Sequence, residues 1–268
     1  MPLQLRVGAL FLRLELGKTA TMESPMSKKF KGMQCAYCLD ATATTVDHVF
    51  SREFFLMEDR GYLPEAPACK KCNDEKSRVE HYLTAVLPFG GRHPQARANL
   101  EGHVPPRLAK NRPLSRLLLT STKPGWIRQE SGIYQPTSFV EFDGKKLEGL
   151  LKYIGRGLAW HHWKVYLRPR DEVIVMLLPD ASNAIFKGLI SHMWPENQVV
   201  ENLGNGTVKY VGIRAADPPQ LTLWQISMYG GLVLSDDRKK ADGESVSCTS
   251  WWVITGPAEL AESFARLR

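Results

Sequence analysis

Two closely spaced cysteine pairs constrain the fold of this chain more than any other feature of its sequence. Cys35 and Cys38 enclose two residues, and Cys69 and Cys72 repeat that spacing further along the chain. Each Cys-x2-Cys turn brings two sulfurs to one side of a tight loop, where both can bind zinc at about 2.3 Å. Two such turns complete a tetrahedral shell, so the sequence predicts a structural zinc site with no open position for water or substrate.

The main alternative for these cysteines is redox chemistry, as two disulfides or as a thioredoxin-like pair. No secretory signal is evident, because the apolar run 10–16 is interrupted by Arg13 and Glu15, which also makes it unsuitable as a membrane span. We therefore expect a cytoplasmic protein with reduced thiols that bind zinc, and no membrane partner. Cys248 is expected to be a small buried residue of a strand.

The residues between the two pairs predict a strand that carries a histidine and a carboxylate. Residues 43–50 are rich in β-branched side chains, which favour strands. His48 can take a proton from water near neutral pH, and Asp47 can supply an oxygen to a divalent cation. Neighbouring strand residues point to opposite faces, so the strand must twist, bulge or end here for both to reach one phosphate. Taken alone, His48 is better explained as a structural histidine.

A helix is predicted directly after the second pair. From Asn73 onward, apolar residues recur at helical spacing, at positions 79, 82, 83 and 86. We expect Asn73 at the N-cap and Asp74 and Glu75 in the first turn, where carboxylates complement the helix dipole. Capping is a sufficient explanation of Asn73 when that residue is considered by itself.

Together these features resemble the zinc-containing type of HNH endonuclease. The resemblance rests on the first cysteine pair, an Asp-His-Val step, and a Cys-x2-Cys-Asn run with Lys76 three residues beyond it. It covers residues 33–88 and implies a ββα-metal unit, in which a β-hairpin and a helix lie in a treble-clef zinc frame. Ser51 stands where many members carry proline, and Pro64 stands where the family usually carries an asparagine that braces the loop.

The resemblance also implies roles for individual residues. His48 becomes the general base that activates water, while Asp47 and Asn73 hold one catalytic cation. An oxygen-rich, partly hydrated site of this kind favours Mg²⁺ or Mn²⁺. The implied reaction is phosphodiester hydrolysis, in which water attacks phosphorus in line with the leaving 3′ oxygen. The structural zinc ligands are then Cys35, Cys38, Cys69 and Cys72, and the candidate phosphate contacts are Arg52, Lys70, Lys71 and Lys76.

The charge distribution favours a nucleic-acid partner. The chain has a net charge of +7, and residues 1–135 contain 20 basic and 13 acidic residues, against 15 of each in the remainder. The excess positive charge therefore accompanies the cysteine pairs and the segment after them. Such a surface attracts phosphates independently of base sequence, and we expect DNA, most simply double-stranded. In the segment 84–135, the most one-sided part, a solvated basic connector and a DNA-gripping arm are equally good explanations.

The sequence divides into four segments. Residues 1–32 are expected to form an extension outside the fold, and residues 33–88 the HNH-like unit. Residues 89–135 read as a proline-interrupted basic connector with one short helix, and residues 136–268 as an α+β domain with a mostly antiparallel sheet. No role or oligomeric state is predicted for that last domain. Its expected helices are 146–163, 184–193 and 257–267, and its expected strands are 172–178, 206–213, 221–229, 231–235 and 248–254, with a tight hairpin at 229–231.

Two functions from different classes remain open on the sequence. One is an HNH-type DNA endonuclease, and the other is a non-catalytic zinc-bound module that binds nucleic acid or protein. Asp47, His48 and Asn73 favour the enzyme, whereas Pro64 favours the module.

Overall fold

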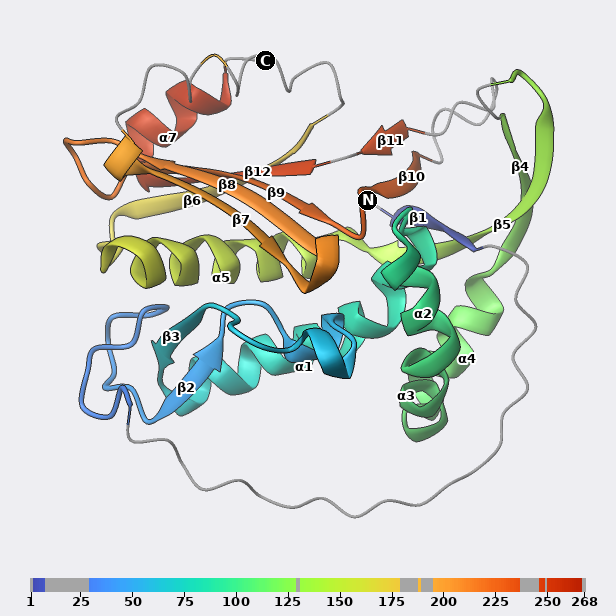
Figure 1. The fold of residues 1–268 in the computed structure, drawn as a ribbon, viewed down its shortest axis with the longest axis horizontal. Coiled ribbons are helices and arrows are strands. Elements are labelled where there is room, and N and C mark those ends of the chain that lie inside the picture. The colour runs from blue at the N-terminus through green and yellow to red at the C-terminus, as the bar shows by residue number, and fades with distance from the viewer. Residues whose placement is uncertain are drawn as a thin grey trace.

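The molecule consists of a large sheet, a long helix beneath it, and a smaller hairpin-and-helix unit beneath that helix (Figure 1). The computed structural model describes residues 2–7, 29–128, 131–178, 188, 195–236, 246–248 and 250–266. Within these residues helices and sheets are mixed and the named strands pair antiparallel, as expected for the α+β class.

The main sheet has five strands in the order β6-β12-β9-β8-β7. Alternate residues of these strands are buried on opposite faces. On one face Trp224 contacts Trp163 of the long helix, and on the other Leu223 packs in a cluster with Ala261 of helix α7, Ala258–Ala265. The strands are β6 Asp171–Leu178, β7 Gln198–Leu203, β8 Val208–Arg214, β9 Thr222–Met228 and β12 Ser250–Pro257.

The second sheet joins segments that are far apart in the sequence, in the order β11-β10-β1-β5-β4. Strand β1 lies between β5 and β10, so residues 2–7 belong to a sheet, whereas we expected them to lie outside the fold. The strands are β1 Pro2–Val7, β4 Lys123–Arg128, β5 Tyr134–Asp143, β10 Leu232–Asp236 and β11 Val246–Cys248.

The predicted hairpin at 229–231 is wrong, although a tight turn is present. Tyr229, Gly230 and Gly231 have φ angles of 52°, 70° and 94°, and Gly231 N–H donates to Met228 O at 3.0 Å. This turn carries the chain out of the main sheet and into the second sheet, so β9 and β10 do not pair. Glycine indicates the turn correctly, because it tolerates positive φ, but it does not indicate which sheet the next strand joins.

The long helix α5, Gly144–Trp163, lies at the centre of the fold and confirms the helix expected at 146–163. Asp143 caps its first turn by accepting hydrogen bonds from the N–H groups of Lys145 and Lys146. Close packing needs a glycine here, because a Cβ at Gly157 would meet Val49 of the lower unit at 2.9 Å. The buried stripe of the helix consists of Leu147, Leu150, Leu151, Ile154 and Leu158.

The lower unit contains the cysteine pairs, the hairpin of β2 Thr45–His48 and β3 Glu65–Ala68, and helix α1, Lys70–Val86. Short 3-10 helices, Arg52–Phe54 and Met57–Asp59, connect the two strands. The unit packs against α5, and one continuous hydrophobic cluster extends from Cys35 to Val253.

The segment expected to be a connector is largely helical. It forms α2 Pro94–Gly102, α3 Val104–Lys110 and α4 Arg112–Ser121, after a 3-10 helix, Leu87–Gly90. Each of these helices has proline at its first or second position, where the missing N–H costs nothing. Pro94, Pro105 and Pro113 therefore lie at the starts of helices, whereas Pro124 lies in strand β4.

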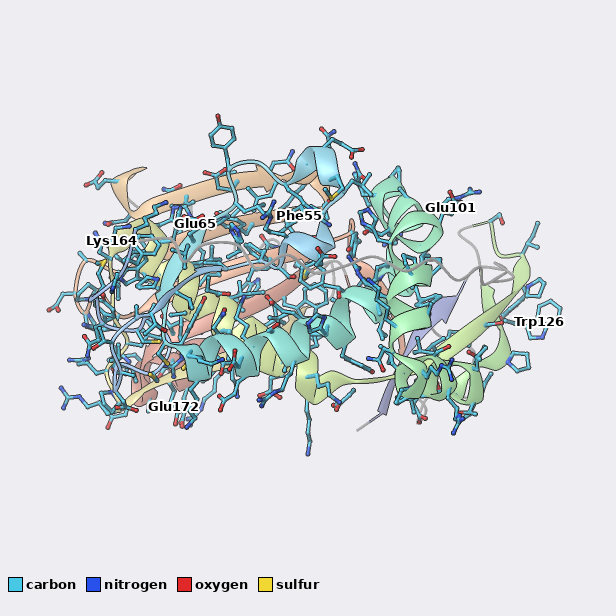
Figure 2. The ribbon with its side chains drawn as sticks, turned by 90° about the horizontal axis from the view of Figure 1, so that it is seen from below. Phe55, Glu65, Glu101, Trp126, Lys164 and Glu172 are labelled. Atoms are coloured by element: carbon cyan, nitrogen blue, oxygen red, sulfur yellow. The ribbon has the colours of Figure 1, made fainter. Side chains whose placement is uncertain are left out.

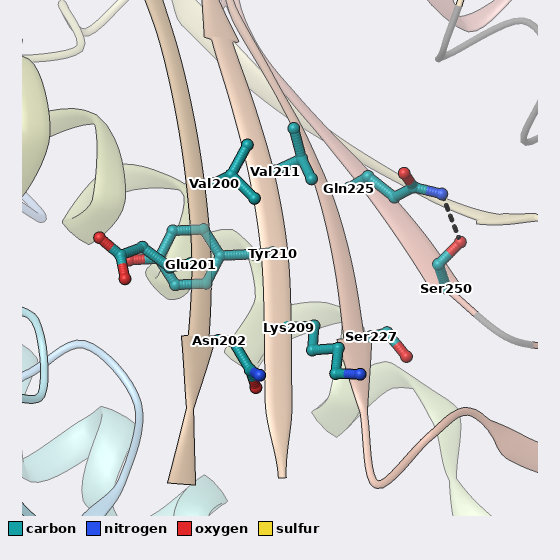
Figure 3. A pocket seen from close by; sticks show the side chains of 9 residues that line it. All are labelled: Val200, Glu201, Asn202, Lys209, Tyr210, Val211, Gln225, Ser227 and Ser250. Carbon is teal, nitrogen blue, oxygen red and sulfur yellow. Dashed lines mark hydrogen bonds between the residues drawn. The ribbon is translucent and has the colours of Figure 1, made fainter. Parts of the chain in front are cut away.

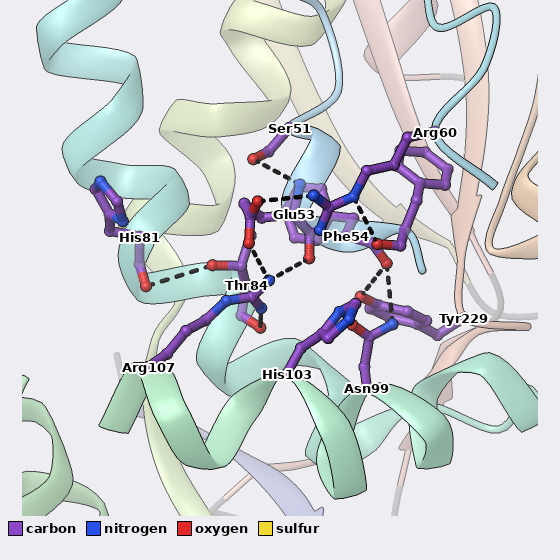
Figure 4. Close-up of polar contacts among 11 residues, drawn as sticks. Ser51, Glu53, Phe54, Arg60, His81, Thr84, Asn99, His103, Arg107 and Tyr229 are labelled. Carbon is purple, nitrogen blue, oxygen red and sulfur yellow. Dashed lines mark hydrogen bonds and ion pairs between the residues drawn. The ribbon is translucent and has the colours of Figure 1, made fainter. Parts of the chain in front are cut away.

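A polar network attaches α2 and α3 to the lower unit (Figure 4). Arg107 donates to Thr84 O at 3.0 Å and to both the carbonyl and the carboxylate of Glu53. The fully buried Asn99 donates to Phe54 O, which also accepts from the hydroxyl of Tyr229 at 2.8 Å. Arg107 is thus committed to the interior, and it does not contribute to the basic surface.

The helix predicted at 184–193 lies outside the described residues apart from position 188. None of the helices in the part of the chain that the structure describes is both long and apolar enough to cross a membrane. The remaining 3-10 helices are Pro195–Asn197 and Gly204–Gly206.

The central position of α5 predicts a graded response to truncation of Ile154, which is fully buried. Ile154→Ala is expected to lower the free energy of unfolding by about 2–5 kcal/mol, and Ile154→Val by about 0.5–1.5 kcal/mol. Denaturant unfolding measures both, and Lys145→Ala on the exposed side of the same helix is the control. Equal costs for the two Ile154 variants would contradict the close packing at this position.

Candidate metal centre and histidine site

The four cysteines of the two pairs converge on one point. Their sulfurs all lie within 4.8 Å of one another, and the Sγ atoms of Cys38 and Cys69 are 3.9 Å apart. A tetrahedron with zinc–sulfur bonds of 2.3 Å has an edge of about 3.8 Å, so this spacing fits a zinc ion. All four are free thiols. The structure therefore brings the predicted ligands together in a cluster that can hold zinc.

The first pair lies on a compact loop held against β3. Cys35 N–H donates to Ala41 O at 2.9 Å, and the positive φ of Leu39, 62°, turns the loop back on itself. The loop is fixed to the second pair by Cys69 N–H, which lies 3.3 Å from Cys35 Sγ. Hydrogen bonds to sulfur favour the ionised form that metals bind.

The thiols cannot all ionise at this separation without a cation. Burial raises the pKa of Cys35, and burial together with the charge of Cys35 raises the pKa of Cys72. Burial also opposes ionisation of Cys38, but backbone hydrogen bonds at Asp40 and Ala41 outweigh it and lower the pKa of that thiol. A zinc ion would offset both the cost of ionising buried thiols and the repulsion between the thiolates, because it binds deprotonated sulfur.

Both basic and acidic side chains lie around the cysteines. A pocket of about 470 Å³ is lined by three of the cysteines together with Lys71, Lys152 and Arg156, and also by Asp40 and Glu75. The guanidinium of Arg156 donates to Tyr37 O at 3.1 Å, beside the first pair. It is therefore the donor set of four sulfurs, together with its spacing, that fits zinc.

Helix α1 begins earlier than the sequence predicts, and this changes the role of Asn73. Cys69 is the N-cap, and its Sγ accepts from Cys72 N–H at 3.5 Å. Asn73 lies inside the first turn, where its N–H donates to Cys69 O at 3.0 Å, so the prediction that it caps the helix is wrong. Asp74 and Glu75 accordingly fall beyond the first turn. With Cys69 at the N-cap and Cys72 in the first turn, the sulfurs of both cysteines lie on one turn of α1 and reach the same cluster.

His48 is the last residue of β2, so the strand ends at the Asp47–His48 pair, which is one of the arrangements expected. In the antiparallel register His48 lies opposite Glu65. Beyond the pair, Val49 N–H donates to Pro64 O at 2.8 Å. Pro64 thus holds the chain next to His48 through its carbonyl.

The imidazole of His48 is half-buried and faces a carboxylate. Nδ1 lies 3.9 Å from Glu65 Oε1, and it has no hydrogen-bond partner among the described residues. Burial lowers the pKa of His48 below its usual value, although the charge of Glu65 acts in the opposite direction. His48 is therefore neutral near pH 7, which is the form that accepts a proton.

Asp47 is buried and faces away from solvent. Its Oδ1 accepts from Lys76 Nζ at 3.2 Å, and its Oδ2 lies 3.0 Å from the same ammonium and accepts from the hydroxyl of Tyr37. Both carboxylate oxygens are occupied, so Asp47 and Asn73 do not form an open pair of oxygen ligands. The residues as they lie do not fit the expected Mg²⁺ or Mn²⁺ ion.

Lys76 is not a phosphate contact, contrary to the prediction. Its side chain is 0% exposed and lies between Asp47 and Glu80, with Nζ 2.6 Å from Glu80 Oε1 and 2.7 Å from His48 O. Burial opposes its charge, but the two carboxylates outweigh burial and raise the pKa of Lys76. Burial raises the pKa of Glu80 to about 7, with Lys76 acting in the opposite direction.

The other three predicted phosphate contacts are exposed at the surface of the lower unit. Arg52 begins the 3-10 helix after His48, and Lys70 and Lys71 begin α1. Lys70 forms an ion pair with Asp74 at 2.8 Å. Their role in binding phosphate stays a prediction.

Four residues that contact His48, Asp47 or their partners were not anticipated: Glu65 faces His48, Tyr37 binds Asp47, Glu80 binds Lys76, and His161 binds Glu65. Nδ1 of His161, in α5, lies 3.1 Å from Glu65 N and 2.9 Å from Glu65 O, next to the strand position opposite His48. Only the hairpin register, once known, would have indicated Glu65 from the sequence.

A pocket of about 400 Å³ on the main sheet offers no comparable chemistry (Figure 3). It lies across β7, β8, β9 and β12, where Gln225 donates to Ser250 Oγ at 3.2 Å. The residues that line it include neither histidine nor cysteine, and we assign it no role.

No protein-family model matches this chain, and no curated protein matches its sequence. Function must therefore be argued from the site itself.

The cysteine cluster predicts that zinc is needed for the fold of the lower unit. Cys69→Ser is expected to lose most of the bound zinc and to melt at a lower temperature, because structural zinc contributes folding free energy. Plasma mass spectrometry measures the metal, and circular dichroism follows melting. Cys248→Ser, outside the cluster, is the control and should keep one zinc per chain. Unchanged zinc content in Cys69→Ser would contradict the assignment.

The raised pKa of Glu80 predicts a pH-dependent loss of stability. A carboxyl whose pKa is higher in the folded state contributes most at low pH, and its contribution falls as the pH rises from 4.5 to about 7. Glu80→Gln cannot ionise, so its stability should decline less between pH 6 and pH 8 than that of wild type. Denaturant unfolding at both pH values tests this, with the exposed Glu148→Gln as control. Equal declines in wild type and Glu80→Gln would refute it.

Proposed function

We propose that this chain is a metal-dependent DNA endonuclease of the HNH type, with His48 as its general base. The observation that carries the proposal is the order of structure around the cysteine cluster: a cysteine loop, an antiparallel hairpin that ends in His48, and a helix whose first turn holds the second pair. That order supports a treble-clef zinc frame around a ββα-metal unit, as the resemblance implies. Zinc is then a scaffold, and the chemistry belongs to His48.

The chemistry follows from the state of His48. The neutral imidazole accepts a proton from water as the water oxygen forms its bond to phosphorus. The bond from phosphorus to the leaving 3′ oxygen breaks, and that oxygen takes a proton from solvent water to become a hydroxyl. The proton taken from the attacking water remains on His48 until it returns to solvent. The carboxylate of Glu65, 3.9 Å away, then stabilises the imidazolium. The exposed Arg52, Lys70 and Lys71 are proposed to hold the phosphates.

The proposal includes a divalent cation only because the sequence resemblance to HNH endonucleases implies one. In the conformation described, Asp47 is bound to Lys76 and Tyr37, so no step is assigned to a metal. The cation dependence of cleavage is therefore a direct experimental question, with Mg²⁺ and Mn²⁺ as the candidates.

A non-catalytic zinc-bound module that binds nucleic acid or protein is the second candidate. The observation that favours it is the buried cluster of Asp47, Lys76 and Glu80, which occupies the carboxylate of Asp47 and leaves no open oxygen site there. Both candidates are proposed to act in the cytoplasm, and they differ in whether His48 is required.

A plasmid-nicking assay separates the two candidates. Removal of a general base is expected to lower the cleavage rate by about 10²–10⁴-fold, so His48→Ala should be almost inactive with Mg²⁺ or Mn²⁺. The wild-type rate should rise with pH and reach half its maximum below the usual histidine pKa of 6.5, because burial lowers that of His48.

His81→Ala, an exposed histidine of α1, is the matched control and should cleave like wild type. Wild type that binds DNA but does not cut it with either metal would eliminate the enzyme. Equal cleavage by wild type and His48→Ala would eliminate the role of His48 alone.

A further inference from the structure

The surface formed by α4 and the β4–β5 ribbon, called here the arm, combines positive charge with exposed aromatic side chains. In Figure 2, Trp126 of β4 lies at the opposite end of the molecule from Lys164, the residue after α5. Strand β4 is the edge of the second sheet and pairs only with β5 among the described strands. The arm is thus open on one side.

Positive charge dominates two of the three elements of the arm. Helix α4 and strand β4 carry four basic residues and no acidic residue, whereas β5 adds Glu141 and Asp143 at its end next to α5. Arg107 is committed to Glu53, but Arg112, Arg116 and Lys123 are exposed, and the described residues offer them no ion-pair partner. Arg112 and Arg116 lie one turn apart and line one hollow on α4. Uncompensated cations on one helix face attract phosphates.

Aromatic rings on the arm share one face. The antiparallel register places Trp126 opposite Pro136 and Arg128 opposite Tyr134, so Trp126 and Tyr134 lie diagonally on the same side of the ribbon. Trp126 is 62% exposed and Tyr134 is 52% exposed. The other described tryptophans are largely buried, whereas Tyr62, outside the arm, is exposed as well. Exposed aromatic faces suit unpaired bases, which stack while cations along the strand neutralise their phosphates.

We propose that the arm binds a single-stranded segment of nucleic acid, with Arg112, Arg116 and Lys123 on the phosphates and Trp126 and Tyr134 stacked on bases. This deepens the proposed function, because it adds a strand-holding surface to a DNA-cutting site. It does not require cleavage, so the two can fail separately.

Binding is measured by fluorescence anisotropy on full-length His48→Ala protein, without added Mg²⁺ or Mn²⁺. The probes are labelled oligo(dT), oligo(U) and a blunt duplex. Trp126→Ala/Tyr134→Ala should bind oligo(dT) roughly ten-fold more weakly, whereas Trp126→Phe should stay close to the parent protein. Arg112→Gln/Arg116→Gln/Lys123→Gln should reduce the slope of log affinity against log salt by about 2.

The matched control removes three exposed charges elsewhere, as Lys145→Gln/Arg170→Gln/Lys209→Gln, and should leave the slope unchanged. Melting curves check that each variant folds. The aromatic and charge variants change different residues. If one of them does not fold, the binding measured for the other still tests the proposal. Comparison of oligo(dT) with oligo(U) identifies which kind of strand the arm prefers.

Unchanged affinity and salt slope would overturn the proposal. An equal loss on the blunt duplex would overturn the assignment to single strands. Light scattering measures the oligomeric state of the parent protein and of the aromatic variant. If the parent is a dimer and the variant with weaker binding is a monomer, the arm is a contact between two copies of the chain, and the proposal fails.

Discussion

The buried ammonium of Lys76 connects the two halves of the candidate site. It lies on α1 and reaches both Asp47 and the carbonyl of His48 on the hairpin, while Glu80 holds it from its own helix. A lone buried charge of this kind would cost several kcal/mol, so the three groups are stable only as a set. The end of β2 is therefore fixed at the residue that carries the imidazole. The position of His48 depends on this ion cluster as much as on zinc.

The cysteine cluster and the ion cluster lie at opposite ends of the same hairpin. The cysteines join the beginning of α1 to the loop before β2, and Lys76 joins the second turn of α1 to the end of β2. With both in place the strand cannot slide, because a slip by one residue would exchange the buried Asp47 for His48. The arrangement explains why a carboxylate next to the proposed base is buried and paired. It also explains why the motif alone misassigns Lys76.

Local signals predict much of the fold, while long-range pairing is not encoded locally. The cysteine spacing, the strand at His48, the helix α5 and most strands of the main sheet follow from periodicity and metal chemistry. The exchange between sheets after Tyr229 and the approach of His161 to Glu65 do not, because each joins residues far apart in sequence. The resemblance assigned Asp47 by position in a motif; its partners Tyr37 and Lys76 are visible only in three dimensions.

The C-terminal part of the chain contributes to the proposed site and not only to its surroundings. Gly157 lets α5 approach Val49, and His161 contacts the backbone of Glu65, so the helix touches both strand ends next to His48. The carbonyl of Pro64 and His161 of α5 both bond the backbone next to His48. The arm joins the other end of the same helix, because β5 ends at Asp143 and α5 begins at Gly144. One helix therefore links the surface proposed to hold a strand to the histidine proposed to cut it.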